Sequence, residues 1–164
     1  MSFSTLDEKF IRRCIELSDL SVASGDAPFG AMVVRDEEVI AESMNGMTQR
    51  VSDHAEVLAL HLAGQKLGSN DLSDCTLYSN CEPCPMCAFM AREYRVKKIV
   101  FAMKSPFMGG YSRWNIMQDE GLLTFKPFFG DQVPEIIAGV LQDEAKKVFD
   151  KTTLWMFGEN PQPR

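Results

Sequence analysis

Apolar residues recur along the chain at two spacings, which predict alternating helices and strands. From Asp7 to about Ser24 they fall every three or four residues, as on one face of a helix. Short apolar runs around Asp36-Glu37 instead predict two strands of a hairpin. The helices expected from the first spacing cover 7–24, 53–67, 83–94 and 141–157. The strands expected from the short runs cover 31–35, 38–42, 76–79, 98–102 and 135–139.

The order of these elements predicts the fold class. Strands and helices alternate after the hairpin, which favours an α/β sandwich around a mixed sheet. The segment 105–130 is rich in glycine, proline and aromatic residues and fits neither spacing. No repeat or long linker divides the chain, so we expect residues 1–164 to form a single domain.

Composition and charge narrow the function. The chain is 45% hydrophobic and 24% charged, as in ordinary globular proteins, and no apolar run is long enough to cross a membrane. Without a signal peptide pattern at its start, we expect a cytoplasmic protein. A net charge of −6 favours a small-molecule substrate over a phosphate backbone. The best candidates for contacts with such a backbone are four basic residues near the third helix, Arg92, Arg95, Lys97 and Lys98. We expect them instead to be a solvated helix end and turn.

Two short motifs supply the candidate chemistry. His54-Ala55-Glu56 is followed by Pro83-Cys84-Pro85-Met86-Cys87. One histidine and two cysteines leave the fourth position of a tetrahedral zinc ion open to water, as in catalytic sites. The spacing of Cys84 and Cys87 at a helix start puts both sulfurs on one side, where the helix terminus favours thiolates. This pattern is typical of zinc-dependent base deaminases, so we expect one Zn²⁺ per chain.

Glu56 is the predicted general base and acid beside that zinc. The alternative is a capping box, in which Asp53 and Glu56 would only satisfy backbone groups at the start of the helix. Cys81 remains open as a third ligand in place of His54, or as part of an iron–sulfur run whose fourth cysteine is missing. The remaining candidates are expected to be structural or surface residues, namely Cys14, Cys75 and His61.

With these motifs the chain resembles members of the cytidine deaminase-like superfamily. It is similar to bacterial guanine deaminases and to tRNA-specific adenosine deaminases. The resemblance rests on Pro28-Phe29-Gly30-Ala31, Asn45, His54-Ala55-Glu56, the run from Cys81 to Cys87, and the run from Gly139 to Glu144. It implies a three-layer α/β/α sandwich with a five-stranded mixed sheet, usually as a homodimer, with zinc on His54, Cys84 and Cys87. It also implies that Glu56 shuttles protons.

The substrate contacts are less well defined by the sequence. The resemblance implies that Asn45 hydrogen-bonds the substrate and that Phe29 walls the base, although Asn45-Gly46 also suits a turn. We further predict contacts at Ala55 and Trp114. Phe107, Tyr111 and Trp114 could stack on a base or pack a dimer interface. The segment 103–114 contains no carboxylate, whereas guanine deaminases have an acidic residue in this region.

Three hypotheses follow from these residues. The first is a zinc-dependent hydrolytic deaminase acting on the exocyclic amine of a free nucleobase or related heterocycle. The second is a tRNA-specific adenosine-to-inosine deaminase, which the negative charge of the chain disfavours. The third is a structural zinc domain without enzymatic activity, which would have no use for Glu56.

Overall fold

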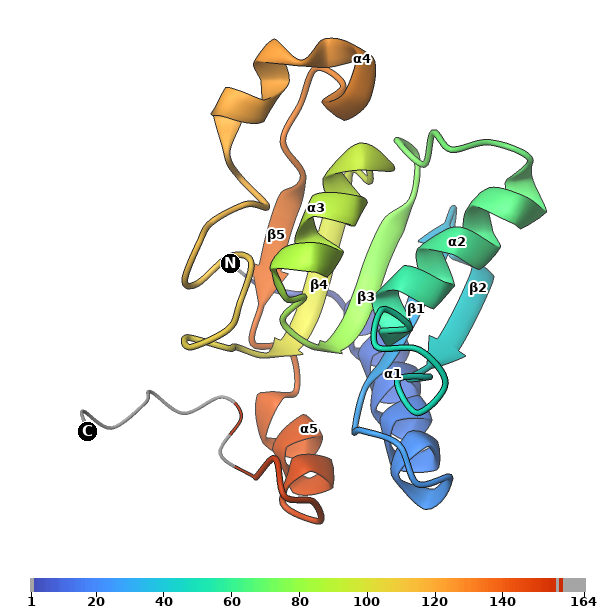
Figure 1. Ribbon diagram of the computed structural model, residues 1–164, viewed down its shortest axis with the longest axis vertical. Helices are drawn as coiled ribbons and strands as arrows, with labels where there is room; N and C mark the ends of the chain where they lie inside the picture. Colours follow the sequence, from blue (N-terminus) through green and yellow to red (C-terminus); the bar gives the residue numbers. More distant parts are fainter. Residues whose placement is uncertain (1, 156, 158–164) are drawn as a thin grey trace.

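A mixed β-sheet of five strands forms the centre of the protein (Figure 1). The computed structural model describes residues 2–155 and 157. The sheet order is β2-β1-β3-β4-β5; β1 is antiparallel to β2 and β3, whereas β3, β4 and β5 are parallel. This confirms the predicted mixed sheet. The strands are β1 (Gly30–Arg35), β2 (Glu38–Met44), β3 (Thr76–Cys81), β4 (Lys98–Met103) and β5 (Glu135–Ala138).

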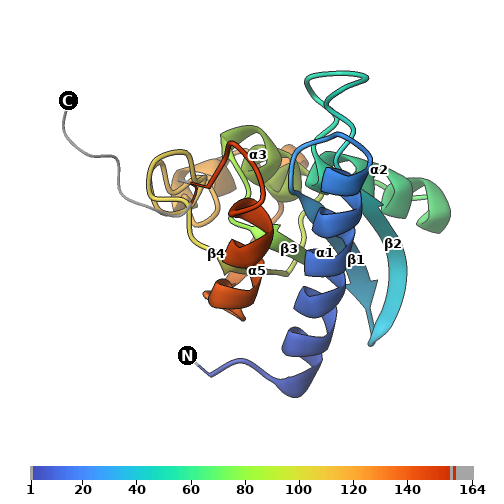
Figure 2. The same cartoon turned by 90° about the horizontal axis from the view of Figure 1, so that it is seen from below.

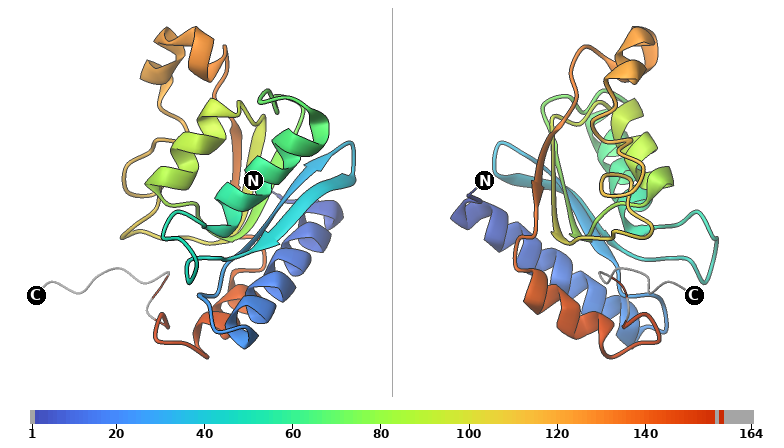
Figure 3. Two further views of the ribbon diagram at one scale, coloured as in Figure 1. Left: turned by 45° about the vertical axis from the view of Figure 1, so that its right-hand side comes forward. Right: turned by 90° about the vertical axis from the view of Figure 1, so that its left-hand side faces the viewer.

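Helices cover both faces of the sheet, which confirms the α/β/α sandwich (Figure 3). One face carries α2 (Ala55–Leu67) and α3 (Pro85–Glu93). The other carries α1 (Thr5–Ala23) and α5 (Gln142–Phe149), which lie side by side in Figure 2. Within the described part of the chain, no helix combines the length and hydrophobicity needed to cross a membrane.

Successive residues of the central strands pack into two separate hydrophobic cores, one on each face of the sheet. Leu77 of β3 packs beneath α2 and α3, whereas its neighbour Tyr78 packs on the side of α1 and α5. Ile99 and Val100 of β4 divide in the same way. This follows from the alternation of side chains along a strand, and it explains why both faces of β3 and β4 are apolar.

The last helix is shorter than predicted. It ends at Phe149, not near Phe157. The hydroxyl and the backbone N–H of Thr152 both donate to the carbonyl oxygen of Phe149, and Leu154 N–H donates to the Thr152 hydroxyl. Such side-chain bonds replace the helical pattern with turns. In the segment that had no predicted structure, a short 3₁₀ helix, η1 (Glu120–Thr124), and α4 (Lys126–Phe129) form.

A buried carboxylate joins α1 to the sheet. Asp7 is 2% exposed and accepts hydrogen bonds from Ser4, from the Tyr78 hydroxyl at 2.9 Å and from Lys98 Nζ at 3.2 Å. Burial acts to raise the pKa of Asp7, but these hydrogen bonds outweigh it and hold the pKa below its ordinary value. The ionised form of Asp7 therefore stabilises the fold.

We expect Asp7→Asn to lower the free energy of unfolding at pH 7 by about 1–3 kcal/mol, because hydrogen bonds to a buried charge are lost. The contribution of a carboxylate with a lowered pKa is fully present above its unfolded-state pKa of about 3.9 and is lost as the pH falls through the folded value. The gap between wild type and variant should therefore narrow below about pH 4. Urea unfolding at several pH values measures this gap. Asp19→Asn, on the surface of the same helix, is the control and should change little.

Candidate metal centre and active site

Three side chains predicted to bind zinc converge at one point between α2 and α3. Cys84 Sγ lies 3.5 Å from His54 Nδ1, Cys87 Sγ lies 3.4 Å from the same nitrogen, and the two sulfurs are 3.6 Å apart. Tetrahedral zinc with ordinary Zn–S and Zn–N bonds holds its ligand atoms about 3.5–3.8 Å from one another. The three donors therefore fit one zinc ion and leave one tetrahedral position without a protein ligand.

The starts of two helices bring these ligands together. His54 is the N-cap of α2 and Cys84 is the N-cap of α3, with Pro85 at the first helical position. Proline suits that position because its missing N–H would have no partner there. Cys87, one turn later, lies on the same side of the helix as Cys84. The two motifs, nearly thirty residues apart in sequence, thus meet through the packing of α2 against α3.

The two cysteines differ in how readily they lose a proton. A hydrogen bond from Cys87, with a further contact to His54, lowers the pKa of Cys84 to about 4. The same contact with Cys84, together with burial, raises the pKa of Cys87. A bound zinc ion would hold both sulfurs as thiolates, so binding of the metal would be accompanied by loss of the remaining thiol proton.

Glu56 lies beside this centre in the interior. Its side chain is 3% exposed, Oε1 accepts a hydrogen bond from Ser79 Oγ at 3.0 Å, and Oε2 is 3.6 Å from Cys87 Sγ. Burial, followed by the charge of Cys84, raises the pKa of Glu56. The capping-box alternative is wrong, since the N-cap is His54, whose side chain makes no capping hydrogen bond, and Asp53 N–H donates to the Arg50 carbonyl instead.

A cavity of about 240 Å³ opens beside the metal ligands. His54, Cys84 and Glu56 form one end of it. Most of the other walls are apolar, which suits the face of a flat ring. The remaining lining residues are Ala27, Phe29, Met47, Glu82, Ser105, Met108, Leu154 and Phe157.

The four predicted substrate contacts lie in different places. Phe29 lines the cavity. Asn45 and Ala55 are buried next to it: the Asn45 amide donates to Asp26 Oδ1 at 3.0 Å and accepts from Ala55 N–H at 3.1 Å. Among the described residues, neither belongs to the cavity lining, and nor does Trp114.

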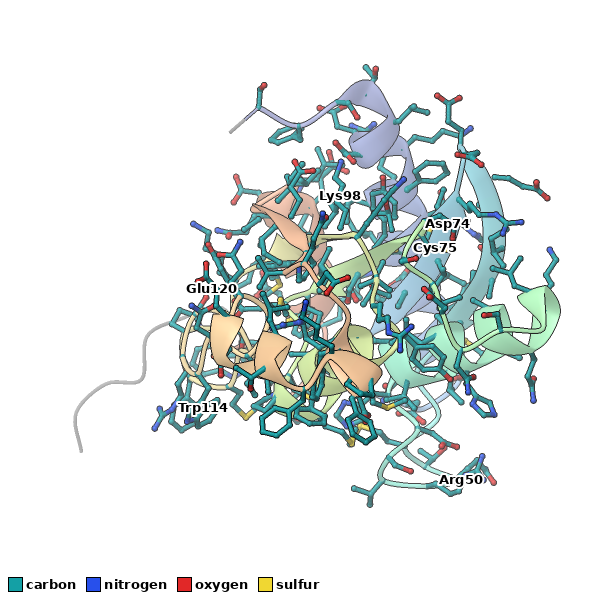
Figure 4. The ribbon with its side chains drawn as sticks, turned by 90° about the horizontal axis from the view of Figure 1, so that it is seen from above. Arg50, Asp74, Cys75, Lys98, Trp114 and Glu120 are labelled. Atoms are coloured by element: carbon teal, nitrogen blue, oxygen red, sulfur yellow. The ribbon has the colours of Figure 1, made fainter. Side chains whose placement is uncertain are left out.

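Trp114 lies at the periphery, on the loop that leads to η1 (Figure 4). It is 51% exposed, as is Phe107, and the Arg113 guanidinium lies 4.6 Å from the Trp114 ring and 5.4 Å from the Phe107 ring. Tyr111, in contrast, packs edge-on against Phe101 of β4. The three aromatic residues therefore do not form one stacking surface.

Three polar residues at the end of β3 support the site and were not predicted. Ser79 holds Glu56. Asn80 accepts from Gly30 N–H and donates to the Pro28 carbonyl, which fixes the turn that carries Phe29. Glu82 bonds the loop after β4. The sequence contained a signal for these supporting roles, namely three polar residues close together at the end of an apolar strand.

The other cysteines and His61 lie away from the metal centre. Cys14, Cys75 and Cys81 are buried in the hydrophobic cores, and His61 is exposed on α2. The donor cluster found among the described residues consists of His54, Cys84 and Cys87. Cys81 is therefore not the third ligand, and the iron–sulfur alternative does not apply.

The basic residues near α3 do not form a solvated helix end. Arg92 is 1% exposed, and its guanidinium donates to the carbonyl oxygens of Ile116, Met117 and Asp119. The expected solvated position was wrong for Arg92, because its guanidinium is buried and holds the loop through these backbone carbonyls. Arg95 pairs with Asp71 and Lys98 with Asp7, which leaves Lys97 exposed.

Relatives of known sequence act on two kinds of substrate. Guanine deaminase of Bacillus subtilis is 41% identical over 98 residues, which make up 58% of this chain and 63% of that protein. The tRNA-specific adenosine deaminase of Bacillus subtilis is 36% identical over 144 residues, 85% of this chain and 84% of the relative.

Solved structures divide in the same way. Guanine deaminase from Nitrosomonas europaea superposes with a TM-score of 0.72 at 28% identity, over 88% of this chain and 82% of that one. A structure from a study of A-to-I editing by tRNA:A34 deaminases superposes with a TM-score of 0.71 at 25% identity, over 85% of this chain and 98% of that one. Residues 4–103 match the cytidine and deoxycytidylate deaminase zinc-binding region. The chain therefore belongs to this family of zinc deaminases.

Proposed function

We propose that the protein is a hydrolytic deaminase that removes the exocyclic amine of a free nucleobase or related heterocycle. The observation that carries this proposal is a buried carboxylate, Glu56, at the end of a small apolar cavity that also exposes the zinc ligands His54 and Cys84. A structural zinc domain needs neither the cavity nor the carboxylate, so the non-enzymatic alternative is disfavoured.

Glu56 moves the protons of the reaction. Bound zinc supplies a Lewis acid that makes water more acidic at its open position. Ser79 holds the Glu56 carboxylate through Oε1, which leaves acceptor capacity on the carboxylate to take a proton from the attacking water. As the water oxygen bonds to the amine-bearing carbon, Glu56 passes this proton to the adjacent ring nitrogen. It then carries the second proton of the water to the amine, which leaves as ammonia when the C–N bond breaks.

The size of the cavity and the net charge of the chain favour a small substrate. A cavity of about 240 Å³ lies below the range of about 300–1,000 Å³ that is usual for drug-sized ligands. The chain carries a net charge of −6, and Arg92, Arg95 and Lys98 are occupied by internal partners. A protein that binds a polynucleotide backbone normally presents free basic side chains.

The second candidate is deamination of adenosine within tRNA. It is favoured by the similarity to the tRNA-specific adenosine deaminase of Bacillus subtilis, which extends over 85% of the chain. A single base flipped out of an RNA loop would also fit a small cavity. The two candidates share the chemistry of Glu56 and differ in what surrounds the base.

We expect Glu56→Gln to keep about one zinc per chain and to lower kcat about 10²–10⁴-fold, because the amide cannot carry protons. Metal analysis and ammonia release measure the two quantities. The two histidines of the chain provide matched controls. His54→Ala should lose both zinc and activity, whereas His61→Ala, on the exposed face of α2, should lose neither. A Glu56→Gln protein that holds zinc and turns over at the wild-type rate contradicts the assigned role.

Ammonia release should be detected from at least one free base in a panel of guanine, cytosine, adenine, isoguanine and related azaheterocycles. We expect tRNA incubated with the protein to contain no inosine. We also expect no salt-dependent binding of tRNA to the protein. Glu56→Gln serves as the blank for both assays. Inosine formation without deamination of any free base would transfer the assignment to the second candidate.

We also infer that the protein is a homodimer. Three phenylalanines of α3 and of the segment around α4 are exposed: Phe89 by 40%, Phe125 by 58% and Phe128 by 61%. Contiguous exposed apolar surface of this kind is typical of protein interfaces. Sedimentation velocity should give twice the chain mass of 18.4 kDa for the wild type. Phe128→Ser should shift the protein toward the mass of a single chain. Val51→Ser, which changes an exposed valine on the loop before α2, should leave the dimer intact.

A further inference from the structure

Glu82 is a buried carboxylate whose hydrogen bonds all go to one loop. It is 4% exposed, and the structure shows no basic side chain paired with it in the part of the chain that it describes. Oε1 accepts from Tyr111 N–H at 3.0 Å and from Ser112 N–H at 2.6 Å. Oε2 accepts from Ser105 N–H at 2.8 Å and from Ser112 Oγ at 2.6 Å. The bonded loop, residues 105–112, begins two residues after the end of β4 at Met103 and is here called the wall loop.

These four bonds decide what Glu82 can do. An ionised carboxylate offers about four acceptor sites, and all of those of Glu82 are taken by donors of the wall loop. Glu82 lines the cavity, but it has no free oxygen with which to take a proton from a substrate. It is therefore a positioning residue and not a second proton shuttle beside Glu56.

The wall loop is folded tightly around Glu82 and the residue after it. Gly109 N–H donates to the Ser105 carbonyl at 2.7 Å, and Gly110 N–H donates to the Pro83 carbonyl at 2.9 Å. A side chain at Gly109 would overlap the Glu82 carboxylate. Pro83 is next to the zinc ligand Cys84, so the loop is held against the segment that carries the metal.

We propose that Glu82 fixes the substrate-facing wall of the cavity, made by Ser105 and Met108, at a set distance from the zinc ligands. Glu82 lies two residues before Cys84, and its bonds reach both ends of the wall loop. The position of that wall determines how a base fits in front of Glu56 and hence the affinity for substrate. This inference rests on the proposed deaminase function.

The test is Glu82→Gln, which keeps the shape of the side chain but replaces two acceptor sites with an NH₂ group that faces N–H donors. We expect amide hydrogen exchange at Ser105, Tyr111 and Ser112 to accelerate by about tenfold or more. KM for the deaminated base should rise about tenfold with a smaller fall in kcat, while zinc content stays the same. Glu42→Gln is the matched control: Glu42 on β2 binds Arg13 of α1 and is not among the cavity-lining residues, so this variant should change none of these quantities.

Ser112→Ala provides a milder second variant, since it removes the hydroxyl bond and leaves the three backbone bonds to Glu82. It should accelerate amide exchange and raise KM, as Glu82→Gln does, but by a smaller factor. If Glu82→Gln does not fold, the Ser112→Ala variant tests the proposal. Unchanged exchange at the three amides, or faster exchange with an unchanged KM, overturns the proposal. If the wild type deaminates nothing, the proposed function fails on its own, whereas the exchange rates still report whether Glu82 holds the wall loop.

Discussion

The carboxyl end of β3 places polar side chains in the interior, and the site depends on how each of them finds a partner. A buried polar group without a hydrogen bond costs about 1–3 kcal/mol, so each must bond something nearby. Ser79 bonds Glu56, Asn80 bonds the backbone on both sides of Phe29, and Glu82 bonds the wall loop. One strand end in the middle of the sheet thereby fixes Glu56 and two walls of the cavity.

The metal centre is built on the same edge from two helix starts. His54 and Cys84 occupy the N-cap positions of α2 and α3. The partial positive charge of a helix N-terminus stabilises thiolates and any negative charge that develops on a substrate, although it does not favour the cation itself. The two cysteine sulfurs supply the charge that the cation needs. Family membership and the donor geometry agree on zinc at this position.

The sequence predicted those parts of the protein whose structure is set by local pattern. Helix α1 and the strands followed from apolar spacing, and the zinc ligands followed from the separation of Cys84 and Cys87 and from the His54 motif. The wall loop could not be predicted, because its conformation depends on bonds to Glu82, which precedes it by more than twenty residues. The burial of Arg92 was missed for a similar reason, because its carbonyl partner at Ile116 is 24 residues away in sequence. The end of α5 at Phe149 is instead a local effect of Thr152, which the apolar spacing alone did not reveal.

The way in which Glu82 holds the wall loop bears on how such an enzyme can evolve. Three of its four bonds are donated by backbone N–H groups, which every residue except proline possesses. Side chains of the loop, such as Met108 and Phe107, can therefore be exchanged while the loop keeps its path and the zinc ligands keep their places. In a scaffold of this kind the metal centre can be kept while the residues that contact the substrate change. Relatives named as a guanine deaminase and a tRNA-specific adenosine deaminase are consistent with such a division between reaction and substrate.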